Sequence, residues 1–506
     1  MKNDEALQWV LAVEKKCVQL ISENREESGD IQELKSQYYA CSAFEKYEIH
    51  NLLLHQFECK DSVFLLSYLI CVLGMDEFQE DAAKQICGEV YDWKTQIMFK
   101  LQLKKLKYST KMQLQRKSIE CLLQDINLCL PYIPIENRDA SKIVIITEQL
   151  LLGSNHAPTL MTLEIAYVLK KYFQYEVEIY TCASNQMIPA YLWVSTIGFH
   201  SGAYGDVEIS YKDVQFCAHQ YPLNECGIDE YQKMLENIYK INPLFVLDVG
   251  VCNAISDLPQ KFTTVVNLNA AISPPVSEAD LFVRLARLTP DTEEEYSEVL
   301  QPYQKQIFME KNFPAVFKVT GRKYERAEWK LPEEKFLVAI VGNRLDQEVS
   351  ELFLQLMQDI LQADARIDFV VIGNVDSLCE RLKKKALEDR VHYLGYCFDL
   401  FGVYSVLDLY LNPIRSGGGW SSAIAMCAGV PVVTLPECDV AYNVTELFTV
   451  KNLDEMFQIV LEYAEDSVFY ERKKQQTKKI AEKNGEAGTV QFLTEMLQKI
   501  KEEMSK

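Results

Sequence analysis

Residues 411–422 read Leu411-Asn412-Pro413-Ile414-Arg415-Ser416-Gly417-Gly418-Gly419-Trp420-Ser421-Ser422. The apolar run that leads into them, residues 406–411, predicts a buried strand that ends in a triple-glycine loop. A helix is expected to open at Ser421 and Ser422, which would cap it, and to stop at Gly429. This order places free backbone N–H groups and a positive helix end around a gap suited to phosphate.

The glycine loop carries the candidate ligand-binding residues. Glycines remove side chains where a ligand would approach the backbone, and three in a row exceed what strand–helix packing requires. We therefore interpret the loop as ligand-binding, with a plain glycine turn as the alternative. Trp420 either packs beneath the loop or touches the ligand. The candidates are Ser416, Gly417, Gly418, Gly419, Trp420, Ser421 and Ser422, the last two offering hydroxyls to phosphate.

The bulk composition limits the class of protein. The chain has 506 residues, which predicts about three domains. Hydrophobic residues make up 48% of it, so it is expected to be globular rather than disordered. The net charge of −21 argues against a nucleic-acid partner held by phosphate contacts. The longest apolar run, residues 62–75, is too short to span a bilayer, so no transmembrane segment is expected.

The cysteines predict a reducing compartment. There are fifteen, without regular spacing, and no C-x-x-C motif occurs. Cys217, His219 and Cys226 are the nearest approach to a metal set, but their spacing is wrong for zinc and they lie in a β-like segment. No metal site is therefore predicted. The N-terminus lacks the layout of a signal peptide, and we expect a cytoplasmic protein.

The chain divides into three predicted domains. Residues 1–140 are expected to form an all-helical domain, because the first proline is Pro131 and the preceding sequence is rich in Leu, Gln, Glu and Lys. Residues 141–332 and 333–506 each alternate apolar strands with helices, which predicts two α/β units of Rossmann-like type. Strands are predicted at 143–147, 177–181, 244–248, 262–268, 336–341, 367–372 and 391–394, an extra strand pair within 201–222, and helices at 159–171, 347–362 and 376–387.

The segment around the glycine loop resembles the donor-binding segment of GT-B glycosyltransferases. The shared features are Asn412-Pro413, the glycine loop, the hydroxyl pair, and Ala428-Gly429-Val430-Pro431-Val432-Val433-Thr434. The resemblance is clear over residues 336–434 and weaker over 142–275. It is closest to the protein-modifying branch, which includes O-linked N-acetylglucosamine transferase and the bacterial adhesin N-glycosyltransferases. It implies a UDP-sugar as co-substrate, no other cofactor, and an acceptor that is a protein, with the helical domain as its docking surface.

One departure from the family pattern leaves two alternatives open. Many retaining GT-B enzymes place two glutamates eight positions apart around this loop, and the second holds the donor ribose. Ser416 and Ile424 stand at those positions here. Either the ribose is held differently, or donor binding is degraded and the chain is a non-catalytic GT-B subunit that supports a partner transferase.

The resemblance also implies roles for residues near other strand ends. Arg344, just past the strand 336–341, matches a basic residue that neutralises the leaving diphosphate, and a guanidinium holds two phosphate oxygens at once. Arg415 is a second basic candidate, and either arginine could instead be an ion-pair partner. Leu394, Gly395 and Tyr396 are candidates for the base site.

The acceptor side offers candidate general bases. His156 follows the first strand of its unit in a Gly/Ser loop, and its imidazole suits proton transfer near neutral pH. Asp248, at the end of a later strand, and Glu148 are alternatives. No Asp-x-Asp pair occurs, which disfavours a metal-dependent GT-A enzyme, and no G-x-S-x-G elbow indicates a hydrolase. The sequence thus predicts a metal-independent glycosyltransferase.

Overall fold

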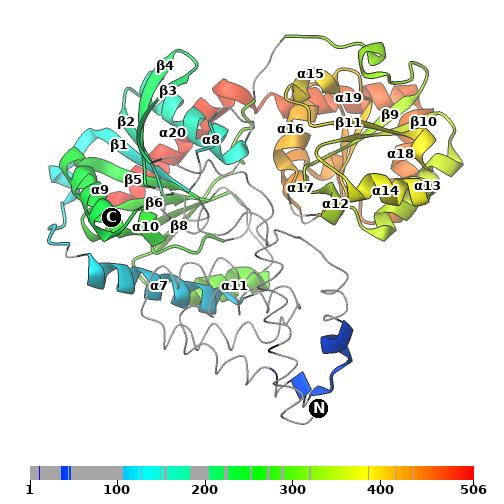
Figure 1. Ribbon diagram of the computed structural model, residues 1–506. Helices are drawn as coiled ribbons and strands as arrows, with labels where there is room; N and C mark the ends of the chain where they lie inside the picture. Colours follow the sequence, from blue (N-terminus) through cyan, green and yellow to red (C-terminus); the bar gives the residue numbers. More distant parts are fainter. Residues whose placement is uncertain are drawn as a thin grey trace. The chain divides into compact units, whose positions relative to one another are not determined.

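The computed structural model of the protein describes most of the chain after residue 105 (Figure 1). The described residues are 11, 36–43, 45–46, 49, 106–126, 128–148, 150–152, 156–182, 204–221, 226–250, 254–269, 274–285, 290–310, 312–317, 321–385, 387–415, 417–436 and 438–506. The predicted helical domain at 1–140 lies mostly outside them and stays a prediction. The chain divides into two units. The first comprises residues 1–154, 169–309 and 497–506, and the second comprises residues 155–168 and 310–496.

The first unit contains an eight-stranded sheet in the order β3-β4-β2-β1-β5-β6-β7-β8. All neighbours are parallel except the hairpin β3–β4 at one edge, which confirms the extra strand pair expected within 201–222. Strands β7 and β8 were not predicted, because they are only four residues long and lack a long apolar run. The strands are β1 Asp139–Thr147, β2 Glu176–Thr181, β3 Gly205–Tyr211, β4 Val214–Gln220, β5 Pro243–Val249, β6 Val265–Leu268, β7 Leu281–Arg284 and β8 Lys305–Phe308.

Helices cover the first sheet and bury its apolar side chains. One core cluster joins Val144 and Ile146 of β1 to Leu122 of α7 and Leu235 of α9. Helix α7 therefore packs against this sheet. The helices of this unit are α7 Tyr108–Asp125, α9 Ile228–Ile241, α10 Ala254–Asp257 and α11 Pro290–Val299, with short 3-10 turns at Ile135–Asn137 and Leu258–Lys261. Helix α8, Ala157–Lys171, belongs to the second unit up to residue 168 and to the first from residue 169.

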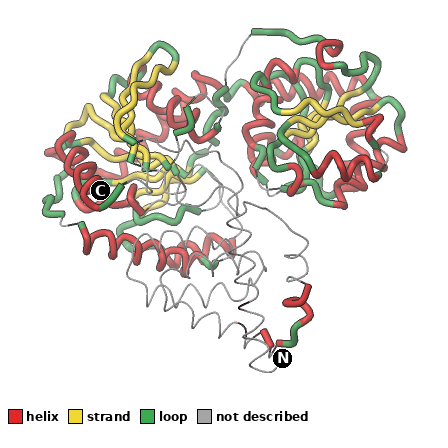
Figure 2. The backbone as a smooth tube through the Cα atoms, viewed as in Figure 1, coloured by secondary structure: helices red, strands yellow, loops and turns green. Residues whose placement is uncertain are grey.

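The second unit is built on a five-stranded parallel sheet in the order β11-β10-β9-β12-β13 (Figure 2). Strands β10 and β11 follow β9 on one side of it, and β12 and β13 then lie on its other side. The strand order therefore reverses at β9, as in doubly wound nucleotide-binding sheets. Ligands of such sheets bind beyond the carboxyl ends of the strands, at this reversal. The strands are β9 Phe336–Val341, β10 Ile367–Ile372, β11 Val391–Gly395, β12 Leu409–Leu411 and β13 Val432–Val433.

Successive side chains of β9 point to opposite faces of the second sheet, and both sets are apolar and packed against helices. Val338 and Ile340 belong to a core cluster with α13 and α18, whereas Leu337, Ala339 and Val341 belong to another with α15, α16 and α17. The helices are α12 Leu345–Glu348, α13 Glu351–Ala363, α14 Ser377–Lys384, α15 Leu400–Tyr404, α16 Gly419–Cys427, α17 Asp439–Val444, α18 Leu453–Glu465 and α19 Ser467–Ala481, with 3-10 turns at Arg326–Trp329, Glu388–Arg390 and Glu446–Phe448. The last helix, α20 Gly485–Met504, belongs to the second unit up to residue 496 and to the first from residue 497.

Several predicted boundaries differ from the structure, and three of the differences have a clear local cause. The helix expected over 347–362 is two helices, because Val349 leaves helical geometry and Ser350 caps α13 by accepting from the Phe353 N–H. The strand expected over 406–411 is shorter, since Val406 and Leu407 end the turn after α15 instead. The helix expected to open at Ser421 begins at Gly419. Among the described helices, none has the length and apolar character needed to cross a membrane.

Candidate nucleotide-sugar site

A cavity of about 200 Å³ lies where the second sheet predicts a ligand site. Its walls come from the residues after β9, β10 and β11 and from the first turns of α16. Parallel strands end there and a helix begins there, so backbone N–H groups face the same space. The lining residues are Leu160, Val316, Phe317, Val341, Gly342, Asn343, Ile372, Gly373, Tyr396, Cys397, Phe398, Leu400, Phe401, Trp420, Ser421 and Ile424.

The glycine loop turns the chain from β12 into α16. Gly417 and Gly418 have φ of +105° and +84°, a left-handed conformation that other residues rarely adopt. Gly418 is the N-cap, and α16 starts at Gly419. A side chain on Gly417 would meet Arg344, and one on Gly418 would meet Arg415. The left-handed backbone therefore accounts for two of the three glycines without a ligand, and the interpretation of the loop as ligand-binding stays a prediction.

The two serines do not cap the helix as predicted. Ser421 and Ser422 lie inside its first turn, and their hydroxyls donate to the carbonyls of Gly418 and Gly419 at 2.9 and 2.8 Å. Ser422 is fully buried, so its hydroxyl is not available to a ligand. Ser421 lines the cavity, as do Trp420 and Ile424. Ser416 lies outside the described residues.

Arg344 lies beside the loop, as the prediction required. It follows β9 and is the N-cap residue of α12. Its guanidinium lies 2.7 Å from the position that a Cβ of Gly417 would take, and it pairs with Glu348 at 2.9 Å. Its side chain is 45% exposed, so a ligand can reach it. Arg344 is therefore an accessible cation next to the start of α16.

Arg415, the second candidate for the diphosphate, has a structural role instead. Its side chain is 3% exposed and its guanidinium pairs with Glu348 Oε2 at 2.8 Å. The remaining N–H groups donate to Asn412 Oδ1, the Val341 carbonyl and the Tyr410 hydroxyl at 2.7–2.9 Å. These bonds occupy four of the five N–H donors of a guanidinium that is almost fully buried, so Arg415 is poorly placed to bind a phosphate.

Glu348 joins the two arginines in one network. Tyr410, which receives a hydrogen bond from Arg415, also lies 3.1 Å from the Ser421 hydroxyl. The network therefore runs from Ser421 at the cavity, through Tyr410 and Arg415, to Glu348 and then Arg344. Sequence reasoning missed Glu348 and Tyr410. The available signal was the spacing of Arg344 and Glu348, four residues apart at the start of a predicted helix.

Aromatic side chains line the part of the cavity nearest β11. Tyr396 and Phe398 are 38% and 73% exposed and meet edge to face, with ring centroids 4.9 Å apart. Phe317 and Phe401 stack with centroids 5.4 Å apart. The structure thus places Tyr396 in the cavity as predicted, and adds Phe398. Gly395 precedes them with φ +71° and accepts a hydrogen bond from the Gly373 N–H at 2.9 Å.

His156 directly precedes α8. Its Nδ1 lies 2.9 Å from the Thr159 hydroxyl, and burial lowers the pKa of the imidazole to about 4. The ring is therefore neutral at pH 7 and able to accept a proton. Leu160, whose N–H donates to the His156 carbonyl at 3.0 Å, lines the cavity one turn further along.

Asp248 belongs to the other unit and is fully buried at the end of β5. Its Oδ2 accepts from Asn267 Nδ2 at 2.6 Å, and within the described part of the chain its Oδ1 has no hydrogen-bond partner. Burial, with a smaller effect of the Glu148 charge, raises the pKa of Asp248 to about 7. Because Asp248 is completely buried, its carboxyl cannot contact an acceptor substrate from solution. The side chain of Glu148, the other alternative base, lies next to Gly250.

Comparison with known proteins identifies the enzyme class. Residues 335–466 match the family described as glycosyl transferases group 1. No curated protein matches the chain by sequence. An O-GlcNAc transferase mutant of Thermobaculum terrenum is structurally similar, with a TM-score of 0.57, 14% identity, and 99% and 96% of the two chains covered.

Two further solved structures resemble the chain more distantly. The HepE protein of Anabaena, in complex with UDP and glucose, has a TM-score of 0.49 and 14% identity over 71% of this chain and 100% of its own. An E. coli trehalose-6-phosphate protein bound to UDP-2-fluoro glucose has a TM-score of 0.48 and 11% identity over 71% and 99%.

The sheets and the family match together define the class. The segment that matches glycosyl transferases group 1, residues 335–466, lies within the second unit, which carries the cavity. The predicted enzyme class is thus confirmed: the chain is a glycosyltransferase. The two α/β units, with the similarity to the Thermobaculum structure, give it a GT-B-like fold.

Proposed function

We propose that the protein transfers a sugar from a nucleotide diphosphate sugar, with UDP as the nucleotide, and that it needs no metal ion to do so. The observation that carries the proposal is the cavity at the carboxyl ends of β9, β10 and β11, closed by the N-terminus of α16 and flanked by Arg344. The similarity to group 1 glycosyltransferases covers Arg344, α16 and every lining residue except Leu160, Val316 and Phe317.

The diphosphate would lie between Arg344 and the start of α16. The first N–H groups of a helix have no partner inside the helix, and its dipole places positive charge there. Arg344 adds a full charge and up to two charge-assisted hydrogen bonds. These groups would stabilise the diphosphate as it leaves the sugar, which is the task that a metal ion has in other transferases.

The base would lie against Tyr396 and Phe398. Both rings are exposed at the cavity and offer apolar faces or edges to a planar base. Ile424 lines the cavity where many relatives of this fold carry a carboxylate for the ribose. The ribose is therefore held here without a charged partner from that position.

The acceptor is proposed to be a protein. Support comes from the resemblance to protein-modifying transferases and from the similarity to an O-GlcNAc transferase. The predicted helical domain at 1–140 would bind the acceptor or a partner protein. His156, neutral at pH 7, would take the acceptor proton, since Asp248 is fully buried.

Calorimetric titration in EDTA tests this proposal. UDP, GDP and TDP are titrated into the wild type, Arg344→Ala and Arg366→Ala. Arg366 is the matched control, since it also pairs with a nearby carboxylate, is 56% exposed, and directly precedes β10 at the opposite end of the strands.

The proposal predicts that UDP binds without metal. Loss of the Arg344 contacts, worth about 1.5–3 kcal/mol, should weaken binding by about ten- to a hundredfold, with no change in Arg366→Ala. If no nucleotide binds, the donor site is refuted and the non-catalytic subunit becomes the better description. Equal weakening in both variants would remove the role of Arg344.

A further inference from the structure

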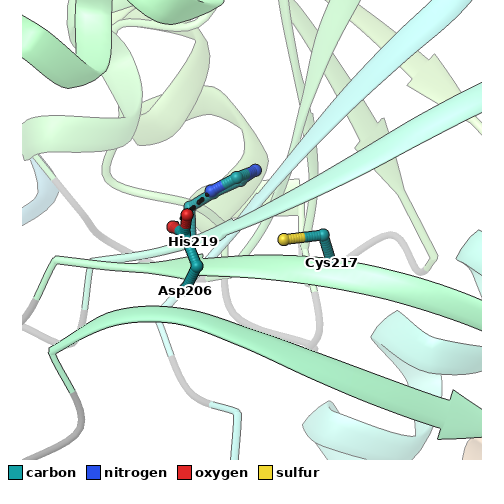
Figure 3. Close-up of side chains that lie close together, drawn as sticks. All are labelled: Asp206, Cys217 and His219. Atoms are coloured by element: carbon teal, nitrogen blue, oxygen red, sulfur yellow. Dashed lines mark hydrogen bonds and ion pairs between the residues drawn. The ribbon is translucent and has the colours of Figure 1, made fainter.

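A group of chemically reactive side chains lies outside the cavity, on the edge hairpin of the first sheet. In the antiparallel register of β3 and β4, Asp206 is opposite His219 and Glu208 is opposite Cys217. Because side chains alternate along a strand, all of these project from one face of the hairpin. Figure 3 shows the Asp206 carboxylate bonded to His219, with the Cys217 sulfur pointing toward the pair.

The donor atoms of Asp206, Cys217 and His219 all lie within 4.8 Å of one another. The ring of His219 is held at both nitrogens, since Nδ1 lies 2.7 Å from Asp206 Oδ1 and Nε2 lies 3.4 Å from Glu178 Oε2. Tyr180 packs on the ring, with centroids 4.6 Å apart. The imidazole is therefore fixed in orientation beside the thiol.

The charge of this face favours a cation. Three carboxylates, those of Asp206, Glu178 and Glu208, act on the thiol of Cys217 and make its surroundings negative. Within the described ranges, the ion pairs of Glu178 and Asp206 are made only with His219. A divalent cation would offset the negative charge and favour the thiolate.

We propose that Asp206, Cys217 and His219 bind a zinc ion. A thiolate, an imidazole and a carboxylate are the ligands that zinc prefers, at about 2.3 Å for sulfur and about 2.0–2.2 Å for nitrogen and oxygen. Tetrahedral ligands at these distances are about 3.3–3.7 Å apart, so the side chains need only small rotations to close on the ion. Water fills the fourth position.

The surrounding groups fit this arrangement. Asp206 and Nδ1 of His219 bind the ion together, while the Nε2–H donates to Glu178, as a carboxylate commonly does behind a zinc-bound histidine. Binding displaces the proton of the thiol and any proton on Nδ1 to solvent, so it weakens as the pH falls. The ion would tie the two strands of the hairpin together at the open edge of the sheet.

The spacing of Cys217 and His219 alone could not reveal this site. Cys226, the cysteine nearest to them in the sequence, is buried in the core of the first unit instead. The third ligand, Asp206, lies on the neighbouring strand and becomes visible only through the strand register.

The test uses cobalt(II) as a spectroscopic probe and zinc as competitor, on the full chain stripped with chelator. The wild type is compared with Cys217→Ser, His219→Gln and Cys129→Ser, the last removing another exposed cysteine as control. The proposal predicts a near-ultraviolet thiolate-to-cobalt charge-transfer band that one equivalent of zinc abolishes. Cys217→Ser and His219→Gln should each bind one equivalent of cobalt(II) less than the wild type, whereas Cys129→Ser should bind the same amount as the wild type.

Two results would overturn the proposal: no thiolate band in the wild type, or a band and stoichiometry that persist in both Cys217→Ser and His219→Gln. In either case the cluster is only a hydrogen-bonded histidine on a strand edge. Binding of UDP in EDTA is measured separately, so failure of this site leaves the donor site untouched.

Discussion

Glu348 pairs with two arginines, the exposed Arg344 and the buried Arg415. Glu348→Ala should therefore destabilise the protein strongly, although Glu348 lies on a helix of only four residues. Its carboxylate is 2.9 Å from Arg344 and 2.8 Å from Arg415, whose side chains are 45% and 3% exposed. An exposed pair contributes about 0–1 kcal/mol, but removing one partner of a buried pair costs about 3–5 kcal/mol.

The magnitude for this site should fall at the lower end of that range. Arg415 keeps three neutral acceptors after the substitution, Asn412, Tyr410 and the Val341 carbonyl, and these partly compensate the buried charge. We expect Glu348→Ala to lower the free energy of unfolding of the second unit by about 3 kcal/mol. Glu351→Ala, which removes a 70%-exposed partner of Arg381, should cost less than about 1 kcal/mol.

Hydrogen exchange measured by mass spectrometry suits this test, because it reports the stability of each unit separately. Peptides covering β9 and α16 should lose about 3 kcal/mol of protection in Glu348→Ala, and peptides of the first unit should not change. A loss below 1 kcal/mol in these peptides would refute the reasoning, because Arg415 would then not depend on Glu348 for its charge compensation.

The remaining predictions concern the loop and the two candidate bases. Gly417→Ala places a side chain on left-handed backbone, next to Arg344. It should lower the free energy of unfolding, measured by thermal denaturation, by about 1–2 kcal/mol, and it should also weaken UDP binding. Unchanged UDP affinity would contradict the contact with Arg344. If His156 is the base, with its pKa lowered to about 4, turnover should be constant from pH 5.5 to 8, whereas a rise centred near pH 7 would indicate Asp248. Because the pKa of Asp248 and Asp257 is raised to about 7, their contribution to stability is complete below about pH 4 and is lost as the pH rises toward 7. Asp248→Asn should therefore be more stable relative to the wild type at pH 8 than at pH 4 in denaturant titrations, and a pH-independent difference would contradict this.

The sequence predicted the parallel strands well, for a physical reason. Strands such as β9 are apolar on both faces because helices cover both, and the continuous run 336–341 shows this directly. Strands β7 and β8 escaped prediction because four residues are too few for such a run to be distinguished from loop.

The candidate site was predicted in position but not in detail. Arg344 and Arg415 are alike in sequence, and only the fold shows that one is exposed and the other buried. Ser421 and Ser422 were predicted to cap α16, but Gly418, in a left-handed conformation, is the N-cap residue instead. The helix therefore begins before either serine. Phe398 carried no pattern that distinguished it from a core residue, although it is 73% exposed.

The central claim is that UDP binds in the cavity of the second unit, and hydrogen exchange with and without saturating UDP in EDTA tests it most directly. The account predicts slower exchange in peptides spanning Arg344, Tyr396 and the start of α16, with no change in peptides of α14 and α18 on the other face of the sheet. Saturating UDP that leaves the Arg344 and α16 peptides unprotected would contradict the account.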